Sequence, residues 1–116
     1  MARYAALLYY PEADRPAPDS PEMQALHRAW GAFREEITRA GVLQSGTGLQ
    51  PTPTATTIRV RDGKTLTTDG PFAETKEQLG GLLVMECADL DEAIQWASKI
   101  PAAEHGSVEL RPVWTM

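Results

Sequence analysis

The chain has 116 residues, of which 42% are apolar and 23% charged, and 11 basic against 16 acidic side chains give a formal charge of −5. This length suits one domain, residues 1–116, and excludes the full dinucleotide-binding fold and the eightfold α/β barrel, which need more residues. No apolar run approaches the ~20 residues of a membrane span. The start of the chain, residues 1–10, lacks a cleavable signal pattern. We therefore expect a single cytoplasmic domain without membrane contact.

Cysteine and histidine are too few for a metal centre. Cys87 is the only cysteine, which excludes an internal disulfide, and no ligand spacing relates it to His27 or His105. Cys87 ends an apolar run, residues 82–87, and this position is typical of a buried strand thiol rather than an activated nucleophile. We expect neither a metal nor a cofactor. The acidic balance, without a basic cluster longer than residues 59–61, also argues against direct binding of nucleic acid.

The first predicted elements are a strand and a long helix. The apolar and aromatic run at residues 4–10 stops at Pro11 and predicts a strand. After a proline-rich loop, Ser20 followed by Pro21 is typical of a helix start, and Gly41 can end that helix in the left-handed conformation. An apolar stripe with steps of three and four residues runs between these signals. It consists of Met23, Leu26, Trp30, Phe33 and Ile37.

A β-hairpin is the clearest prediction in the middle of the chain. Residues 42–48 form a weaker strand candidate, and residues 49–53 are a proline-interrupted connection that could form an edge or a bulge. Residues 54–61 then alternate, Asp62-Gly63 follows, and residues 64–68 resume a threonine-rich extended pattern. Aspartate-glycine between two such runs indicates a tight hairpin, because both central residues of that turn need positive φ.

The second half of the chain repeats a strand, helix and strand. Residues 82–87 predict a buried strand, and Asp89 with Glu92 resembles a capping box at the start of a helix that stops by Pro101. His105 is expected in a loop before the last strand, residues 108–113. The chain order β-α-β-β-α-β indicates an α+β, ferredoxin-like antiparallel sheet with both helices on one face and an inserted hairpin.

Both central strands of this sheet are apolar on both faces. In residues 82–87, Leu83 and Met85 point to one face while Leu82 and Val84 point to the other, and residues 4–10 alternate in the same way. Two helices can cover only one face, and the chain offers no third helix for the other. We therefore expect a homodimer packed sheet to sheet, with a small-molecule space at its rims or between sheet and helix.

One segment carries a family resemblance. Residues 69–81 read Asp-Gly-Pro-Phe-Ala-Glu-Thr-Lys-Glu-Gln-Leu-Gly-Gly. This run resembles the signature of the DGPF branch of the YCII-related family, and the likeness extends to residues 30–33, 40–43, 48–61 and 106–112. It implies a dimeric α+β barrel. Related YCII-like proteins include some that resemble lactone-processing or dehalogenating enzymes of aromatic breakdown.

The resemblance also suggests catalytic residues. YCII-like proteins carry a histidine and aspartate pair, and Asp69 corresponds to the aspartate. Their histidine lies near the start of the first helix, where this chain has Glu22 and Met23, and His27 follows about a turn later. A carboxylate at a strand end near a pocket can be desolvated and used for proton transfer, whereas the structural alternative for Asp69 is an Asx-type turn.

Two further residues of the same segment are candidate ligand contacts. Phe72 could line a pocket or plug the core, and Lys76 could bind a polar substrate or lie on a solvated turn. The resulting hypothesis is a small-molecule-binding protein that performs acid–base chemistry of the isomerase, lyase or dehalogenase type on a small organic substrate. The alternative is a non-catalytic regulatory or binding module linked to an extracytoplasmic-function sigma factor, a link that the resemblance alone implies.

Overall fold

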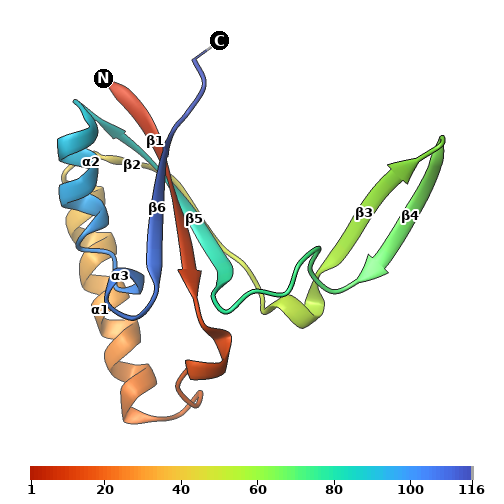
Figure 1. Cartoon of the computed structure of the whole chain (residues 1–116). Coiled ribbons are helices and arrows are strands. Elements are labelled where there is room, and N and C mark those ends of the chain that lie inside the picture. Colours follow the sequence, from red (N-terminus) through yellow and green to blue (C-terminus); the bar gives the residue numbers. More distant parts are fainter. Residues whose placement is uncertain (116) are drawn as a thin grey trace.

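The computed structural model describes residues 1–115 and has two parts, a body built on a four-stranded sheet and a two-stranded arm that projects from it (Figure 1). The strands of the body are β1 (Ala2–Tyr10), β2 (Leu43–Gly48), β5 (Gln78–Cys87) and β6 (Ser107–Pro112). The helices are α1 (Pro21–Arg39), α2 (Leu90–Ala97) and α3 (Ala102–His105), and the arm consists of β3 (Thr56–Arg61) and β4 (Lys64–Asp69).

The sheet of the body is antiparallel and has the strand order β2-β5-β1-β6. With the arm set aside, the chain order is β-α-β-β-α-β, and the helices lie together on one face of the sheet (Figure 1). The predicted ferredoxin-like plan with an inserted hairpin is therefore confirmed. No helix among residues 1–115 combines the length and the apolar character that crossing a membrane requires.

Helix α1 begins and ends at the predicted residues. The Ser20 hydroxyl oxygen accepts a hydrogen bond from the Met23 amide at 3.1 Å, which satisfies one of the free N–H groups of the first turn. Gly41 has a φ of +74° directly after the helix, as the left-handed capping conformation requires. Inside the helix, the rings of Trp30 and Phe33 meet edge to face with their centroids 6.0 Å apart.

The segment after α2 differs from the prediction. The start of α2 agrees with it, because the Asp89 carboxylate accepts a hydrogen bond from the Glu92 amide at 2.9 Å. The loop expected around His105 is instead the short helix α3. Pro101 is already helical, with φ −53° and ψ −33°, and a proline stops one helix yet can begin the next because its missing N–H is not needed there.

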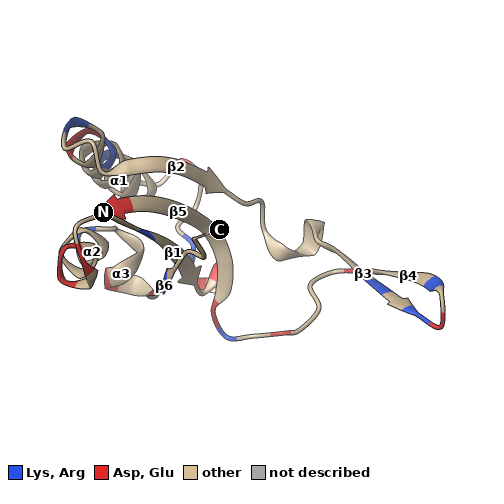
Figure 2. Ribbon diagram, turned by 90° about the horizontal axis from the view of Figure 1, so that it is seen from above, with Lys and Arg blue, Asp and Glu red and all other residues tan. Residues whose placement is uncertain are grey.

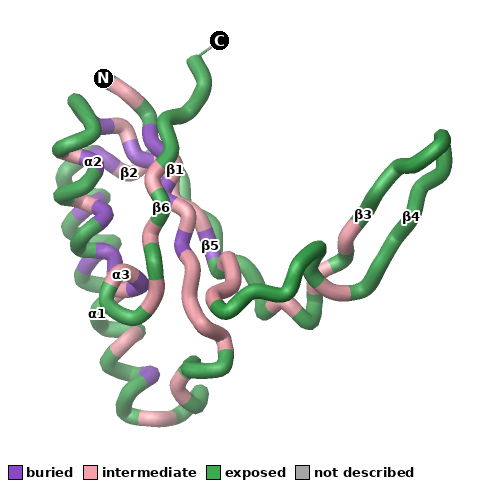
Figure 3. The backbone as a smooth tube through the Cα atoms, viewed as in Figure 1, coloured by how far each residue is buried: buried purple, intermediate pink, exposed green. Residues whose placement is uncertain are grey.

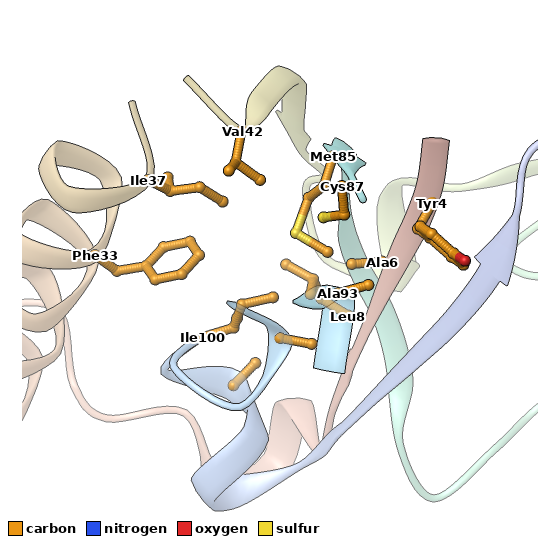
Figure 4. Close-up of a cluster of buried hydrophobic side chains, with 12 residues drawn as sticks. Tyr4, Ala6, Leu8, Phe33, Ile37, Val42, Met85, Cys87, Ala93 and Ile100 are labelled. Atoms are coloured by element: carbon orange, nitrogen blue, oxygen red, sulfur yellow. The ribbon is translucent and has the colours of Figure 1, made fainter. Parts of the chain in front are cut away.

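The hydrophobic core lies between the helices and one face of the sheet (Figure 4). Along β1, Tyr4, Ala6 and Leu8 are buried while their neighbours are not, which is the period-two pattern of a strand covered on one side. Figure 3 shows the buried residues gathered in the body, with the arm exposed. The side chains that are fully buried and largest are Ile37, Met85, Ile100 and Cys87.

The opposite sheet face has no helix over it, and we call it the open face. Its centre is apolar, because the register pairs Ala5 with Val84 and Leu7 with Leu82. All four residues are only partly buried in the single chain. An ion pair between Arg3 and Glu86 at 3.5 Å lies beside this apolar centre. The second apolar face predicted from the sequence is therefore present, and no helix within residues 1–115 covers it.

The arm, residues 56–69, is the predicted hairpin. Asp62 and Gly63 at its tip have φ values of +52° and +74°, as expected for a two-residue turn with positive φ at both positions. Among residues 1–115, the extensive contacts of β3 and β4 are with each other. The arm also extends the molecule. The radius of gyration of the chain is 16.2 Å, whereas a compact domain of this length has about 13 Å.

Candidate functional site

A groove of about 640 Å³ lies between the end of β1, the first half of α1 and helix α3. This volume suits a small organic molecule. We call it the α1–α3 groove. Its apolar surface comes from Pro16, Ala25, Leu26, Ala29 and Pro101, and its ionisable or hydroxyl groups come from Tyr10, Asp14, Glu22, Lys99, Glu104 and His105.

Two local features bring the groove walls together. Pro11 ends β1, and the following turn is folded back so that the Tyr10 hydroxyl lies 3.4 Å from the Asp14 carbonyl oxygen. On the other side, Gly106 connects α3 to β6 directly against β1. A Cβ atom at Gly106 would lie 2.0 Å from the Tyr9 carbonyl oxygen, so only glycine allows this approach. The absence of a side chain there thus places His105 beside the end of β1.

The charges around the groove are mostly negative. Asp14, Glu22 and Glu104 contribute three carboxylates, and Lys99 contributes one ammonium group. That ammonium group is also engaged elsewhere, because Lys99 Nζ lies 2.5 Å from a Glu36 carboxylate oxygen and 5.0 Å from the centre of the Trp96 ring. A groove of this charge attracts cationic molecules, repels phosphates and carboxylates, and does not oppose the entry of neutral molecules.

His105 is the histidine of the groove. Its Nε2 atom lies 4.0 Å from a Glu104 carboxylate oxygen, a contact that becomes an ion pair when the imidazole is protonated. Both side chains remain accessible to a bound molecule, since both are exposed. Histidine is the side chain that most readily accepts and donates protons near neutral pH. The groove therefore combines a proton-transfer group with an apolar wall that could hold an organic ring.

The four residues that the sequence suggested for the site lie outside this groove. Asp69 ends β4 at the base of the arm and is exposed, and Lys76 is exposed in the connection to β5. Phe72 is 79% exposed, so it does not plug the core of its own chain. His27 lies on α1, on the exposed side of the helix. The single chain therefore does not gather these candidates around the α1–α3 groove.

The sequence pointed to only part of the groove. Glu22 occupies the place at the start of the first helix where the resemblance expects a histidine, and it does line the cavity. Tyr10, Asp14 and His105 gave no sequence signal, because their approach depends on the fold of the turn after β1 and on α3. The glycine that follows His105 in the sequence is consistent with a close backbone contact there, and in the structure Gly106 does lie against Tyr9.

The base of the arm is fastened by a second polar cluster. The two Glu12 carboxylate oxygens accept hydrogen bonds from the Thr52 amide at 2.8 Å and the Thr52 hydroxyl at 2.6 Å. The Glu12 amide in turn donates to the Gln78 side chain at 2.8 Å. At the start of the arm, the Gly70 amide donates to the Ala55 carbonyl at 2.7 Å. The bonds to Glu12 tie the segment before the arm to the turn after β1, and the bond from Gly70 to Ala55 closes the hairpin at its base.

Nothing in the described part of the chain resembles a metal centre. Residues 1–115 contain no group of three or more His, Cys, Asp or Glu side chains arranged to hold a metal ion. Cys87 is free and fully buried, and burial, followed by the nearby Glu92 and Asp89, raises the pKa of its thiol above the ordinary value. The ionisable or hydroxyl groups that line the groove are carboxylates, a phenol, an amine and an imidazole.

Comparison with a known structure supports the fold. The chain is similar to 5-chloro-2-hydroxyhydroquinone dehydrochlorinase from Burkholderia phenoliruptrix AC1100, solved in complex with 2,5-dihydroxybenzoquinone. The alignment covers 97% of this chain and 93% of that chain, with a TM-score of 0.53 and 14% sequence identity. At this identity the likeness concerns the fold, which agrees with the ferredoxin-like plan described above.

Comparison of sequences gives the family. An uncharacterised protein of Rhizobium meliloti (strain 1021) is 40% identical over 112 residues, which cover 95% of this chain and 90% of that protein. Residues 2–116 match the YCII-related domain. The match includes the body, the arm and the segment that connects them. The chain therefore belongs to the YCII-related family.

Proposed function

We propose that the chain binds a small organic molecule in the α1–α3 groove and transfers protons on it by acid–base chemistry of its own side chains. The observation that carries this proposal is the composition of the groove. Its volume is about 640 Å³, and its lining combines apolar residues of α1 with Tyr10, Glu104 and His105. A single ring fits this volume. The wall would hold the ring by burying its apolar surface while the polar groups face its oxygen atoms.

His105 is the proposed proton-transfer residue. An imidazole can take a proton from a carbon next to a carbonyl group and return it to another position of the same molecule. Such an isomerisation needs no further reactant. Glu104 next to His105 stabilises the imidazolium that forms in between. The Tyr10 hydroxyl, which donates a long hydrogen bond to the Asp14 carbonyl in the single chain, would donate instead to an oxygen atom of the bound molecule.

The charge of the groove selects the substrate class. Three carboxylates against one ammonium group favour a neutral or cationic molecule over an anion. The structural neighbour is a dehydrochlorinase bound to a dihydroxylated quinone, which supports ring-shaped substrates with oxygen substituents. We therefore propose an uncharged cyclic ketone, lactone or hydroxylated ring as the substrate class.

Asp69 and His27 remain candidates for a different arrangement. Both are exposed, so a site built on them needs cover from a second copy of the chain. The open face supports such a copy, because Leu7, Leu82 and Val84 are apolar and have no helix over them. We propose a homodimer packed through the open faces, in which Asp69, Phe72 and Lys76 lie at the edge of the interface.

Proton transfer in the groove can be tested without knowledge of the natural substrate. Cyclohexanone is neutral, has one ring and exchanges the hydrogens next to its carbonyl group by general-base catalysis. We expect the protein to accelerate their exchange in D₂O, followed by proton NMR, and we expect His105→Gln to abolish this acceleration. His27→Gln makes the same change on the exposed side of α1 and separates the two histidines.

The outcomes of this experiment distinguish the sites. Loss of acceleration in His27→Gln and Asp69→Asn, with His105→Gln unaffected, would overturn the groove and place the chemistry at the base of the arm. Equal exchange with and without protein would contradict proton transfer. Amide chemical-shift mapping with hydroquinone, kept under nitrogen, tests binding alone, and we expect shifts at Leu26 and Ala103 rather than along the arm.

A further inference from the structure

The arm has one apolar face and one cationic face. Strand pairing sets Ile58 opposite Thr67 and Val60 opposite Thr65 on one side, which we call the apolar face of the arm. Ile58 and Val60 are 64% and 59% exposed. A two-stranded hairpin alone is only marginally stable in water, so apolar side chains kept exposed on it indicate a surface that is covered in the working protein.

The other side of the arm is cationic. The pairs Arg59–Leu66 and Arg61–Lys64 place three positive charges on it, and we call it the basic face. Residues 56–69 carry three basic and two acidic side chains, whereas the rest of the chain carries eight basic and fourteen acidic side chains. Figure 2 shows these cationic positions at the outer part of the arm. A net-positive arm on a strongly acidic body is complementary in charge to the body of another copy.

The direction of the arm also favours a second copy of the chain as its partner. In both Figure 1 and Figure 2 the helices lie on one side of the sheet, and the arm leaves on the other side, where the open face is. A second copy packed on the open face therefore lies next to the arm. The hydrogen bonds from Thr52 to Glu12 tie the segment that leads into the arm to the body, and the bond from Gly70 to Ala55 joins the two ends of the arm.

From these observations we infer that the arm is a clasp between two copies of this chain: each arm lies on the body of the partner subunit and packs its apolar face there. This inference rests on the proposed homodimer and not on the chemistry of the α1–α3 groove. It assigns a role to Ile58 and Val60, while the basic face strengthens the association through the acidic body of the partner. It also places Asp69, at the base of the arm, beside the subunit interface.

Removal of the arm is the first test. The Gly70 amide and the Ala55 carbonyl are already hydrogen-bonded, so residues 56–69 can be replaced by Asn-Gly without moving the body. Sedimentation velocity between about 1 and 200 µM compares the shortened chain with the full chain, and we expect the dissociation constant of the dimer to rise about 100-fold or more. Far-UV circular dichroism of the shortened chain reports whether its body is folded.

Point substitutions separate the two faces. Because added acids would cancel charge on the basic face, the matched pairs of substitutions are neutral. Ile58→Asn with Val60→Asn should weaken the dimer. Leu66→Asn with Thr68→Asn, also two residues apart on one strand but on the opposite side, should not. Replacement of Arg59, Arg61 and Lys64 by Gln should mainly reduce the dependence of the dissociation constant on salt. If replacement of Ile58 and Val60 leaves the dissociation constant of the dimer unchanged, the clasp is contradicted.

A crosslink identifies what the arm touches. Cys87 is buried, so Asp62→Cys introduces the one accessible thiol of residues 1–115 at the tip of the arm. A photoreactive maleimide on this thiol, in a mixture of ¹⁴N- and ¹⁵N-labelled protein, should give crosslinked peptides that combine both isotopes. Crosslinks within one isotope alone would overturn the inference.

The remaining outcomes separate this inference from the proposals on which it builds. A full chain that stays monomeric at about 200 µM would overturn both the homodimer and the clasp. A shortened chain that dimerises with unchanged affinity would overturn the clasp and keep the homodimer. A full chain that stays monomeric and binds a fluorescent 20-base-pair DNA duplex through Arg59 and Arg61 would instead assign the arm to nucleic acid. Cyclohexanone exchange by the shortened chain tests the groove separately.

Discussion

Along β1 the inward side chains Tyr4, Ala6 and Leu8 are buried beneath helices, whereas the same alternation along β3 leads to Ile58 and Val60, which are exposed. Both strands therefore carry a row of alternate apolar side chains, but only in the body do helices cover that row. Alternating apolar residues along a strand predict that one face of the strand is buried, but they do not identify the element or subunit that buries it. In the arm, we propose that a second copy provides this cover.

The largest expected effect of a single substitution is in the body, where the backbone at Gly106 lies directly against β1. Gly106→Ala would place a Cβ atom 2.0 Å from the Tyr9 carbonyl oxygen, so α3 and β6 must move apart. We expect a loss of more than about 4 kcal/mol in the free energy of unfolding, measured by urea denaturation. Gly31→Ala is the control, because a Cβ atom in the middle of α1 meets nothing within 4 Å. That change should stabilise the helix by about 0.5–1 kcal/mol.

Two isoleucines compare the regions directly. Ile37 is fully buried in the core, and Ile37→Ala should lower the free energy of unfolding by about 3 kcal/mol. Ile58→Ala should change it by less than about 0.5 kcal/mol at concentrations where the chain is monomeric. With rising protein concentration the effect of Ile58→Ala should grow, because association then contributes to stability. A large effect of Ile58→Ala in the monomer would mean that the arm packs on its own body.

A smaller effect is expected where the arm joins the body. Glu12→Gln keeps the shape of the side chain but removes the charge that strengthens its hydrogen bonds from Thr52, and we expect a loss of about 1 kcal/mol. Hydrogen exchange of the Thr52 amide should become faster, while that of core amides such as Met85 follows global stability. Asp14→Asn removes a charge from the same turn and should leave the exchange of Thr52 unchanged.

The sequence was sufficient for the parts of the fold that depend on local signals. Ser20 with Pro21 marked the start of α1, Asp62-Gly63 marked the hairpin turn, and Cys87 was predicted to be buried. Each of these signals is a property of a few neighbouring residues, such as a side-chain cap or a positive φ. The order of such elements then determined the ferredoxin-like plan.

The candidate site was harder to predict because its residues come from distant parts of the chain. Tyr10, Glu22 and His105 meet only after β1, α1 and α3 have packed. The helix α3 itself was expected as a loop, since four residues after a proline carry too little pattern to indicate a helix. Asp69 stands out in the sequence for its motif, and the structure places it at the base of the arm, where it is exposed in the single chain.

The smallest predicted effect concerns the pH dependence of stability. Burial, followed by Glu92 and Asp89, raises the pKa of the Cys87 thiol, so the folded chain keeps this proton to a higher pH than the unfolded chain does. The unfolded chain therefore releases the proton first, and the free energy of unfolding should fall as the pH rises above about 8.5. Below that pH both states hold the proton, and Cys87 contributes no slope.

Urea denaturation at several pH values between about 7 and 10 can separate this contribution from other groups. Cys87→Ala should reduce the decline in stability above about pH 8.5, because the slope from this thiol disappears. Adding Asp62→Cys to this variant moves the thiol to the exposed tip of the arm, where solvent surrounds both protonation states in the folded and unfolded chains. The original slope should then not return. Its return would mean that the tip of the arm is enclosed by the partner subunit even in dilute solution.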